Sequence, residues 1–177
     1  MARYRTGINR PALDEQGLRE LALAYVGRFA TTRARLTRYL ARKLHERGWD
    51  GEGDPPVEEL AERFRALGYV DDDAFARMKG ASMGRRGLGV ARIRSALMAD
   101  GVGEEDRADA EEQAQRAGWE AAEILARKKR IGPYAVDFAD LKQRERQIAT
   151  FVRAGHDFAT ARAWVEANPG EFPERSE

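Results

Sequence analysis

Few residues of this chain have the types and spacing that enzyme chemistry requires. The sequence holds no cysteine, which excludes thiol nucleophiles, disulfides and cysteine-bound zinc. Ser82 follows Lys79 by one helical turn, a spacing that resembles serine–lysine chemistry only weakly. His45 and His156 belong to no His-x-x-x-His or Glu-x-x-His pair. We therefore expect no enzyme activity, no catalytic residue, no cofactor and no resident metal.

Two further motifs have the residue types of ligand sites in the wrong context. Asp71, Asp72 and Asp73 could in principle bind Mg²⁺, but consecutive side chains at the start of a helix diverge. The segment 84–89 (GRRGLG) follows an expected helix, and it lacks the Lys-Ser/Thr ending of a phosphate loop. It is either a basic hinge that lets a partner approach the backbone or a plain connector between helices.

Charge is the more informative property, because a net charge of +1 conceals strong segregation. Residues 28–47 hold seven arginines and lysines against Glu46 alone, and residues 77–94 hold six with no acid. Acidic residues dominate 50–73 and 104–112, and basic residues return at 127–130. Such alternation predicts a surface with one face for phosphates or an acidic protein, although each run alone is also typical of a solvated helix face. The expected contact residues are Arg35, Arg38, Arg42, Lys43, Arg85, Arg86, Arg92, Arg94, Lys128 and Lys129.

The elements that must position these residues are helices. Abundant Ala, Arg, Glu and Leu with few β-branched residues predict an all-α chain. Apolar periodicity, capping residues and helix-ending glycines indicate where each helix begins and ends. The expected helices are 14–29, 32–47, 56–67, 72–83, 90–100, 104–115, 119–130, 140–154 and 157–167. Aromatic residues expected in the core are Tyr25, Phe29, Tyr39, Phe64, Phe75 and Phe151.

A faint repeat groups these helices in threes. The segment 34–40 aligns with 91–97, so that Leu36 matches Ile93 and Leu40 matches Leu97, and a third copy is placed at 146–155. The separations suit three-helix units, which predict an elongated, curved rod of tandem repeats. The predicted layout is a flexible segment 1–12, repeats 13–70, 71–117 and 118–167, and a flexible tail 168–177.

The chain has no features of a membrane or secreted protein. No apolar run approaches the roughly 18 residues of a membrane span, and the first residues lack the apolar region of a secretory signal. We therefore expect a cytoplasmic protein.

Three segments, taken in order, resemble the RecX family of RecA regulators. The first is the basic helix 33–44 (RARLTRYLARKL), and the second is Leu60–Ala76, which contains LGYVDDDAFA. The third runs from Arg85 to Val102, with R-x-x-x-G-x-x-R-I from Arg85 to Ile93 and D-G-V at its end. The resemblance covers roughly residues 18–165 and is loosest from Trp119 onward.

What the resemblance implies is a non-enzymatic, all-helical, monomeric modulator that binds RecA filaments on DNA. It would lodge along the filament groove, inhibit filament extension and ATPase activity, and act in DNA repair, recombination and the SOS response. The basic residues above would contact the recombinase or, in a salt-sensitive way, DNA phosphates. On this interpretation, Arg92→Glu together with Arg94→Glu weakens inhibition without unfolding the protein. The alternatives are a sequence-independent nucleic-acid-binding helical protein that acts without a recombinase, and a hydrolase with no recognisable motif.

Overall fold

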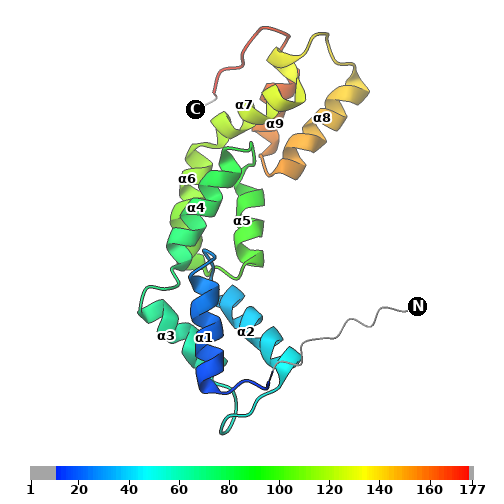
Figure 1. The fold of residues 1–177 in the computed structure, drawn as a ribbon. Coiled ribbons are helices and arrows are strands. Elements are labelled where there is room, and N and C mark those ends of the chain that lie inside the picture. Colours follow the sequence, from blue (N-terminus) through cyan, green and yellow to red (C-terminus); the bar gives the residue numbers. More distant parts are fainter. Residues whose placement is uncertain (1–10, 176–177) are drawn as a thin grey trace, which may run out of the picture. The chain divides into compact units, whose positions relative to one another are not determined.

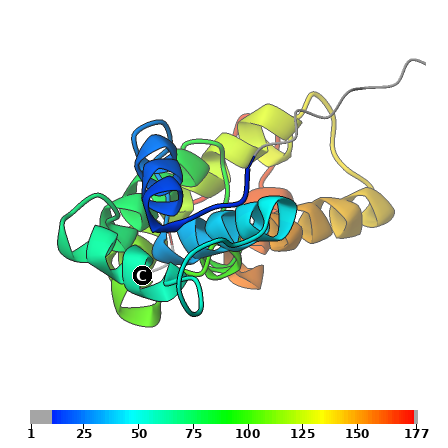
Figure 2. The same ribbon diagram turned by 60° about the horizontal axis from the view of Figure 1, so that its bottom comes forward.

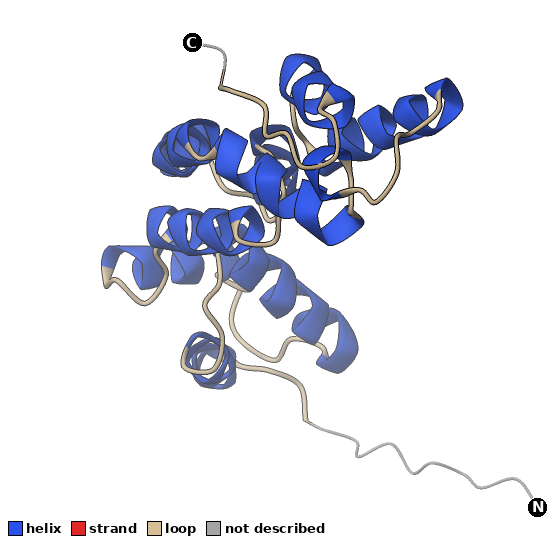
Figure 3. Cartoon of the chain, turned by 90° about the horizontal axis from the view of Figure 1, so that it is seen from above, coloured by secondary structure: helices blue, strands red, loops and turns tan. Residues whose placement is uncertain are grey.

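The chain is all-α, as the composition predicts. The computed structural model describes residues 11–175, in which all regular structure is helical apart from one isolated bridge between Leu13 and Trp49 (Figure 3). The chain divides into two compact units between Asp71 and Asp72. None of the helices in the described part is long and apolar enough to cross a membrane.

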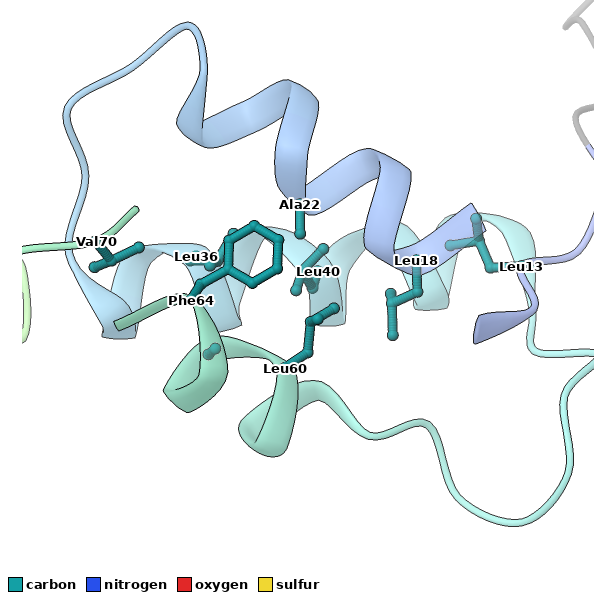
Figure 4. Packing of buried hydrophobic residues seen from close by; sticks show 9 residues of the cluster. Leu13, Leu18, Ala22, Leu36, Leu40, Leu60, Phe64 and Val70 are labelled. Carbon is teal, nitrogen blue, oxygen red and sulfur yellow. The ribbon is translucent and has the colours of Figure 1, made fainter. Parts of the chain in front are cut away.

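The first unit is a three-helix bundle of α1 (Glu15–Val26), α2 (Arg33–Arg47) and α3 (Val57–Ala66). Helix α1 crosses α2, which also packs on α3 (Figure 2). Leucines from all three helices and Phe64 meet between them (Figure 4). The fully buried leucines of this core are Leu13, Leu18, Leu36 and Leu40.

The second unit contains six α-helices within its described residues (Figure 1). They are α4 (Asp72–Gly84), α5 (Val90–Ala99), α6 (Glu104–Arg116), α7 (Gly118–Lys129), α8 (Leu141–Ala154) and α9 (Phe158–Glu166). One apolar cluster, which includes Ile93 and Leu97, lies among α4, α5 and α6. Another, built around Phe151 and Trp164, lies among α7, α8 and α9. We call these the second and third bundles.

Local signals explain why the predicted helices agree with the observed ones within three residues. The side chains of Asp14, Thr32, Asp140 and Asp157 each accept a hydrogen bond from a backbone N–H in the first turn of α1, α2, α8 and α9. Gly68 has φ +75°, the left-handed conformation expected where α3 gives way to α4. Because these caps act over a few residues, the sequence alone was enough to locate them.

Phe29 is a wrong prediction. Helix α1 ends at Val26 with Gly27 as its C-cap, so Phe29 lies beyond the helix and is 57% exposed. It rests against Tyr25 at a ring-centroid distance of 5.5 Å. The apolar stripe of the sequence continues past Val26, the point where the backbone leaves the helix.

Both predicted flexible ends include residues with defined contacts. Pro11 accepts a hydrogen bond from Nε of Arg47, whereas residues 1–10 lie outside the described part. In the predicted tail, the Gly170 N–H donates to the carbonyl of Pro133 in the short 3₁₀ helix Gly132–Tyr134, which the sequence analysis missed. Residues 176–177 also lie outside the described part.

Candidate partner-binding surface

Two of the four basic candidates on α2 are held by local interactions. Nε of Arg38 donates to the carbonyl oxygen of Ala34, one turn earlier, at 3.2 Å. Arg35 is half-buried beside the core of the first bundle. Leu36, the next residue, and Leu40 lie on one face of the helix and are fully buried. The guanidinium group of Arg38 is therefore partly engaged by its own helix, and Arg35 is only partly accessible.

The other two α2 candidates share one acid and one aromatic ring. Arg42 and Lys43 both form ion pairs with Glu46. Their charged ends also lie over Tyr39, at 5.6 and 5.9 Å from the ring centroid. Glu46, the single acid of this basic run, is thus shared by both of these cations.

The glycine-rich segment presents its cations differently. Arg85 and Arg86 follow α4 directly and are exposed, and within residues 11–175 their side chains form no hydrogen bond or ion pair. Nζ of Lys128, from α7, donates to the carbonyl oxygen of Arg86 at 2.9 Å. Cations far apart in sequence are therefore brought together within the second unit.

Backbone hydrogen bonds join this segment to the turn between α8 and α9. The Gly89 N–H donates to the carbonyl of Ala154 at 2.9 Å, and the Ala91 N–H donates to the carbonyl of Gly155 at 3.2 Å. We call residues 87–92 together with 154–156 the junction. It connects the second bundle to the third through main chain, so its geometry does not depend on long side chains.

Two glycines make this approach possible. A Cβ on Gly89 would lie 2.3 Å from the Gly155 carbonyl oxygen, and one on Gly155 would lie 2.4 Å from the Arg92 nitrogen. Gly155 also has φ +95°, which ends α8 in the left-handed conformation. Of the two interpretations left open for the glycine-rich segment, the structure supports a connector, with arginines displayed on its outer side.

His156 completes the junction from its interior. Its ring is 6% exposed and packs against Phe151, and its Nε2 lies 3.0 Å from the carbonyl oxygen of Gly87. Since a carbonyl only accepts, Nε2 donates. Burial lowers the pKa of His156 below its ordinary value, and it outweighs the opposite effects of the Gly87 hydrogen bond and of Asp157. Burial thus favours the neutral form of the imidazole.

Arg92 and Arg94 are both exposed residues of α5, but their roles differ. Nε of Arg94 donates to Glu111 of α6 at 2.7 Å, and Nε of Arg107 donates to the other oxygen of the same carboxylate at 2.8 Å. The side chain of Glu111 is only 16% exposed. Arg94 therefore helps to satisfy a largely buried acid, whereas Arg92 makes no side-chain hydrogen bond or ion pair within the described residues.

The structure thus assembles four of the ten predicted contact residues around the junction, namely Arg85, Arg86, Arg92 and Lys128. We call these the junction cations. Lys129 is exposed in the last turn of α7, next to Lys128. Sequence reasoning missed His156 as a partner of this segment, because the two lie 69 residues apart. The available signal was Gly155-His156 immediately before the helix cap Asp157.

The residues considered for catalysis and for metal binding make other contacts in the structure. Lys79 forms an ion pair with Asp100 of the same bundle rather than contacting Ser82. Asp73, which was considered as a magnesium ligand, pairs with Arg77. In residues 11–175 no three histidine or acidic side chains are grouped as a metal ion would need.

Comparison with known proteins identifies similar chains over most of the length. A protein named "Regulatory protein RecX" from Myxococcus xanthus is 33% identical over 162 residues, which cover 86% of this chain and 86% of that protein. Proteins of the same name from Mycobacterium sp. (strain KMS) and Halorhodospira halophila are 33% and 32% identical. These alignments cover 84% and 86% of this chain, and 81% and 88% of the two relatives. No protein-family model matches the chain.

Solved structures support the same fold. A crystal structure of regulatory protein RecX matches with a TM-score of 0.64 at 23% identity, covering 82% of this chain and 70% of the other. The crystal structure of RecX from Lactobacillus salivarius matches with a TM-score of 0.60 at 18% identity, covering 82% and 90%. At these identities the likeness concerns the all-helical fold.

Proposed function

This chain belongs to the RecX family, and from that premise we propose that it is a non-enzymatic regulator of the RecA recombinase. It binds RecA filaments assembled on DNA, and it inhibits their extension and their ATP hydrolysis. The relatives carry the name of a regulatory protein, which is consistent with action through binding.

The observation that supports this proposal most is the group of junction cations. Arg85, Arg86, Arg92 and Lys128 are exposed, and a main-chain junction holds their segments in place. A fixed basic surface is suited to an acidic protein face or to phosphates, and its contribution weakens with salt. On this proposal a filament, which offers both protein and DNA, is its target.

We extend the proposal to the layout of the chain. The segments 13–70, 71–117 and 118–167 act as tandem three-helix repeats, each with an apolar cluster of its own. Several weak contacts from linked modules then add through effective concentration. The curved rod predicted from the sequence stays a prediction.

The test is the ATPase rate of the cognate RecA on single-stranded DNA, titrated with this protein at moderate salt. We expect inhibition at or below one protein per recombinase subunit, and slower filament extension in a parallel light-scattering assay. No effect at any ratio would contradict the proposal.

The rival function is binding to nucleic acid without a recombinase, which the exposed junction cations favour. It requires tight binding to naked DNA whose logarithmic affinity falls steeply with the logarithm of salt concentration. The same samples, measured by fluorescence anisotropy with labelled DNA alone, separate the two functions.

A further inference from the structure

The second unit also has a groove whose apolar wall has no role in the function proposed for the junction cations. It has a volume of about 330 Å³ and runs between α4, α6 and the start of α7, whose order along the unit is visible in Figure 1. Small and apolar residues from these helices form most of its wall, among them Gly80, Gly84, Ala110, Ala114, Ala121 and Ile124. Pockets of roughly 300 Å³ and above commonly bury bulky ligand groups, so this groove has room for a large apolar side chain.

The groove exists because α4 approaches its neighbours closely at one position and leaves space at the next turn. A Cβ on Gly80 would meet Ala110 and Ile93 at 3.5 Å, the distance of ordinary packing. One turn later, a Cβ on Gly84 would meet no atom within 4 Å. The hollow therefore opens beside Gly84, toward the end of α4.

That end of the groove is basic. Arg85 lines it directly, and Arg86 follows with Lys128 bound to its carbonyl oxygen. Lys128 lies one turn beyond Ile124 on α7, so it continues the groove-lining face of that helix. Glu120 is the single acid of the lining. An occupant with its negative charge near Arg85 and an apolar group near Gly84 complements this arrangement.

We propose that this groove docks a segment of the protein partner in which a large apolar side chain is flanked by carboxylates. The apolar side chain fills the space beside Gly84, and the carboxylates face Arg85 and Lys128. This inference rests on the proposed function, in which the partner is the recombinase filament. It assigns the protein contact to the groove and leaves Arg92 and Lys129 available for other contacts.

The chemistry of the lining favours a protein segment over nucleic acid. No aromatic side chain lines the groove, so it offers no platform on which a base could stack. Its wall is dominated by alanine and glycine, which suit an apolar side chain. A large apolar side chain of a protein segment needs no stacking platform.

Two leucine substitutions test the groove. Gly84→Leu places a side chain in the open space, and leucine also favours helix over glycine, so the second unit should remain folded. Gly118→Leu is the matched control, since Gly118 is also a terminal residue of a helix, the first of α7, has no atom within 4 Å of a Cβ, and lies outside the groove lining. We expect Gly84→Leu to weaken binding to RecA filaments on labelled single-stranded DNA at least 10-fold, and Gly118→Leu to change it less than twofold, with unaltered thermal unfolding for both.

The absence of cysteine allows the occupant to be identified. A single cysteine is introduced as Gln113→Cys, at an exposed position of the groove lining that leaves the space beside Gly84 open. It is labelled with a benzophenone maleimide and irradiated in the filament complex, and Gly118→Cys serves as the control. We expect one predominant crosslinked recombinase peptide, with aspartate or glutamate next to a large apolar residue.

Other results would contradict the docking proposal, and they can be distinguished from failure of the proposed function. If wild type inhibits the filament and Gly84→Leu inhibits equally, the function stands and the groove is not the contact. A crosslinked peptide without acids contradicts the stated chemistry, and a crosslink to DNA assigns the groove to nucleic acid. Self-association of the free wild type that Gly84→Leu abolishes in sedimentation velocity would assign the groove to a second copy. If wild type neither binds nor inhibits filaments, both proposals fall together.

Discussion

Helix α2 and the junction each hold four of the predicted contact cations, but they present them in opposite ways. On α2, Arg42 and Lys43 share Glu46 and cover Tyr39 within a single regular helix. At the junction, Arg85 and Arg86 extend from a turn whose main chain is fixed by the α8–α9 connection. A regular helix places acids and aromatic rings at one-turn spacing from its cations. A turn that is held through its backbone leaves its side chains unengaged. Two segments with the same number of cations in sequence therefore need not offer the same number of cations to a partner.

The largest expected effect comes from breaking the junction itself. Gly89→Ala should lower the free energy of unfolding of the second unit by about 3 kcal/mol, because the added Cβ would sit 2.3 Å from a carbonyl oxygen that cannot move alone. Urea unfolding followed by circular dichroism measures the loss. Gly103→Ala is the control, since Gly103 is also an extended N-cap, with its nearest atom at 3.4 Å. Similar losses for both variants would show that the close approach is not what matters.

Charge reversal tests the difference in availability directly. Arg85→Glu with Arg86→Glu should weaken filament binding roughly 10-fold or more, because exposed cations at an interface lose attraction and gain repulsion. Arg38→Glu with Arg42→Glu should weaken it less than about threefold, because those cations are already engaged on α2. Binding is measured at two salt concentrations. Equal losses would contradict the comparison.

A smaller effect separates Arg94 from Arg92. Arg94→Ala should cost about 0.5–1 kcal/mol of stability, since it removes a partner from the largely buried Glu111 while Arg94 itself is half-exposed. Arg92→Ala should leave stability unchanged and weaken filament binding. Thermal unfolding and filament affinity are measured on both variants, and the opposite assignment of the two effects would disprove these roles.

The expected outcome of substituting both Arg92 and Arg94 by glutamate changes because Arg94 is the partner of Glu111. Arg94→Glu would place a second carboxylate beside Glu111. We therefore expect this variant to lose stability as well as binding, whereas Arg92→Glu alone remains a clean test of the surface.

The smallest effect is a pH dependence. Burial lowers the pKa of His156 in the folded protein, so the unfolded chain takes up this proton first as pH falls. The stabilising contribution is therefore complete above the ordinary histidine pKa of 6.5 and declines as pH falls below it toward the folded-state pKa. His156→Gln, which keeps a donor for Gly87 without a titrating ring, should flatten the stability of the second unit between pH 7 and 5.5. His45→Gln, at an exposed position of α2, should not.

Most helix boundaries could be predicted because they are decided locally. Asp157 caps α9 through Thr160, three residues away, and Gly68 ends its helix by its own φ. Phe29 shows where this reasoning fails, since an apolar stripe does not reveal where the backbone leaves the helix. The equivalence of Leu36 with Ile93 and of Leu40 with Leu97 holds in burial, because each pair occupies the inner face of a corresponding helix.

The candidate surface was predicted only in part. The sequence identified basic segments, but not the partners of their members. Glu111 lies 17 positions from Arg94, and the Arg86 carbonyl lies 42 positions from Lys128. Nothing in the sequence around them shows which of Arg92 and Arg94, two exposed arginines on either side of the buried Ile93, has an acidic partner.

By itself the sequence determined the all-helical class, most of the helix ends, the absence of thiol chemistry and the segregation of charge, because composition and contacts within one turn suffice for these. Only the tertiary structure decided which cations are engaged, how Gly89 and Gly155 bring two bundles into main-chain contact, and where a groove opens beside Gly84. Those features depend on atoms from segments tens of residues apart. Their positions relative to one another are set by packing, which no local pattern encodes.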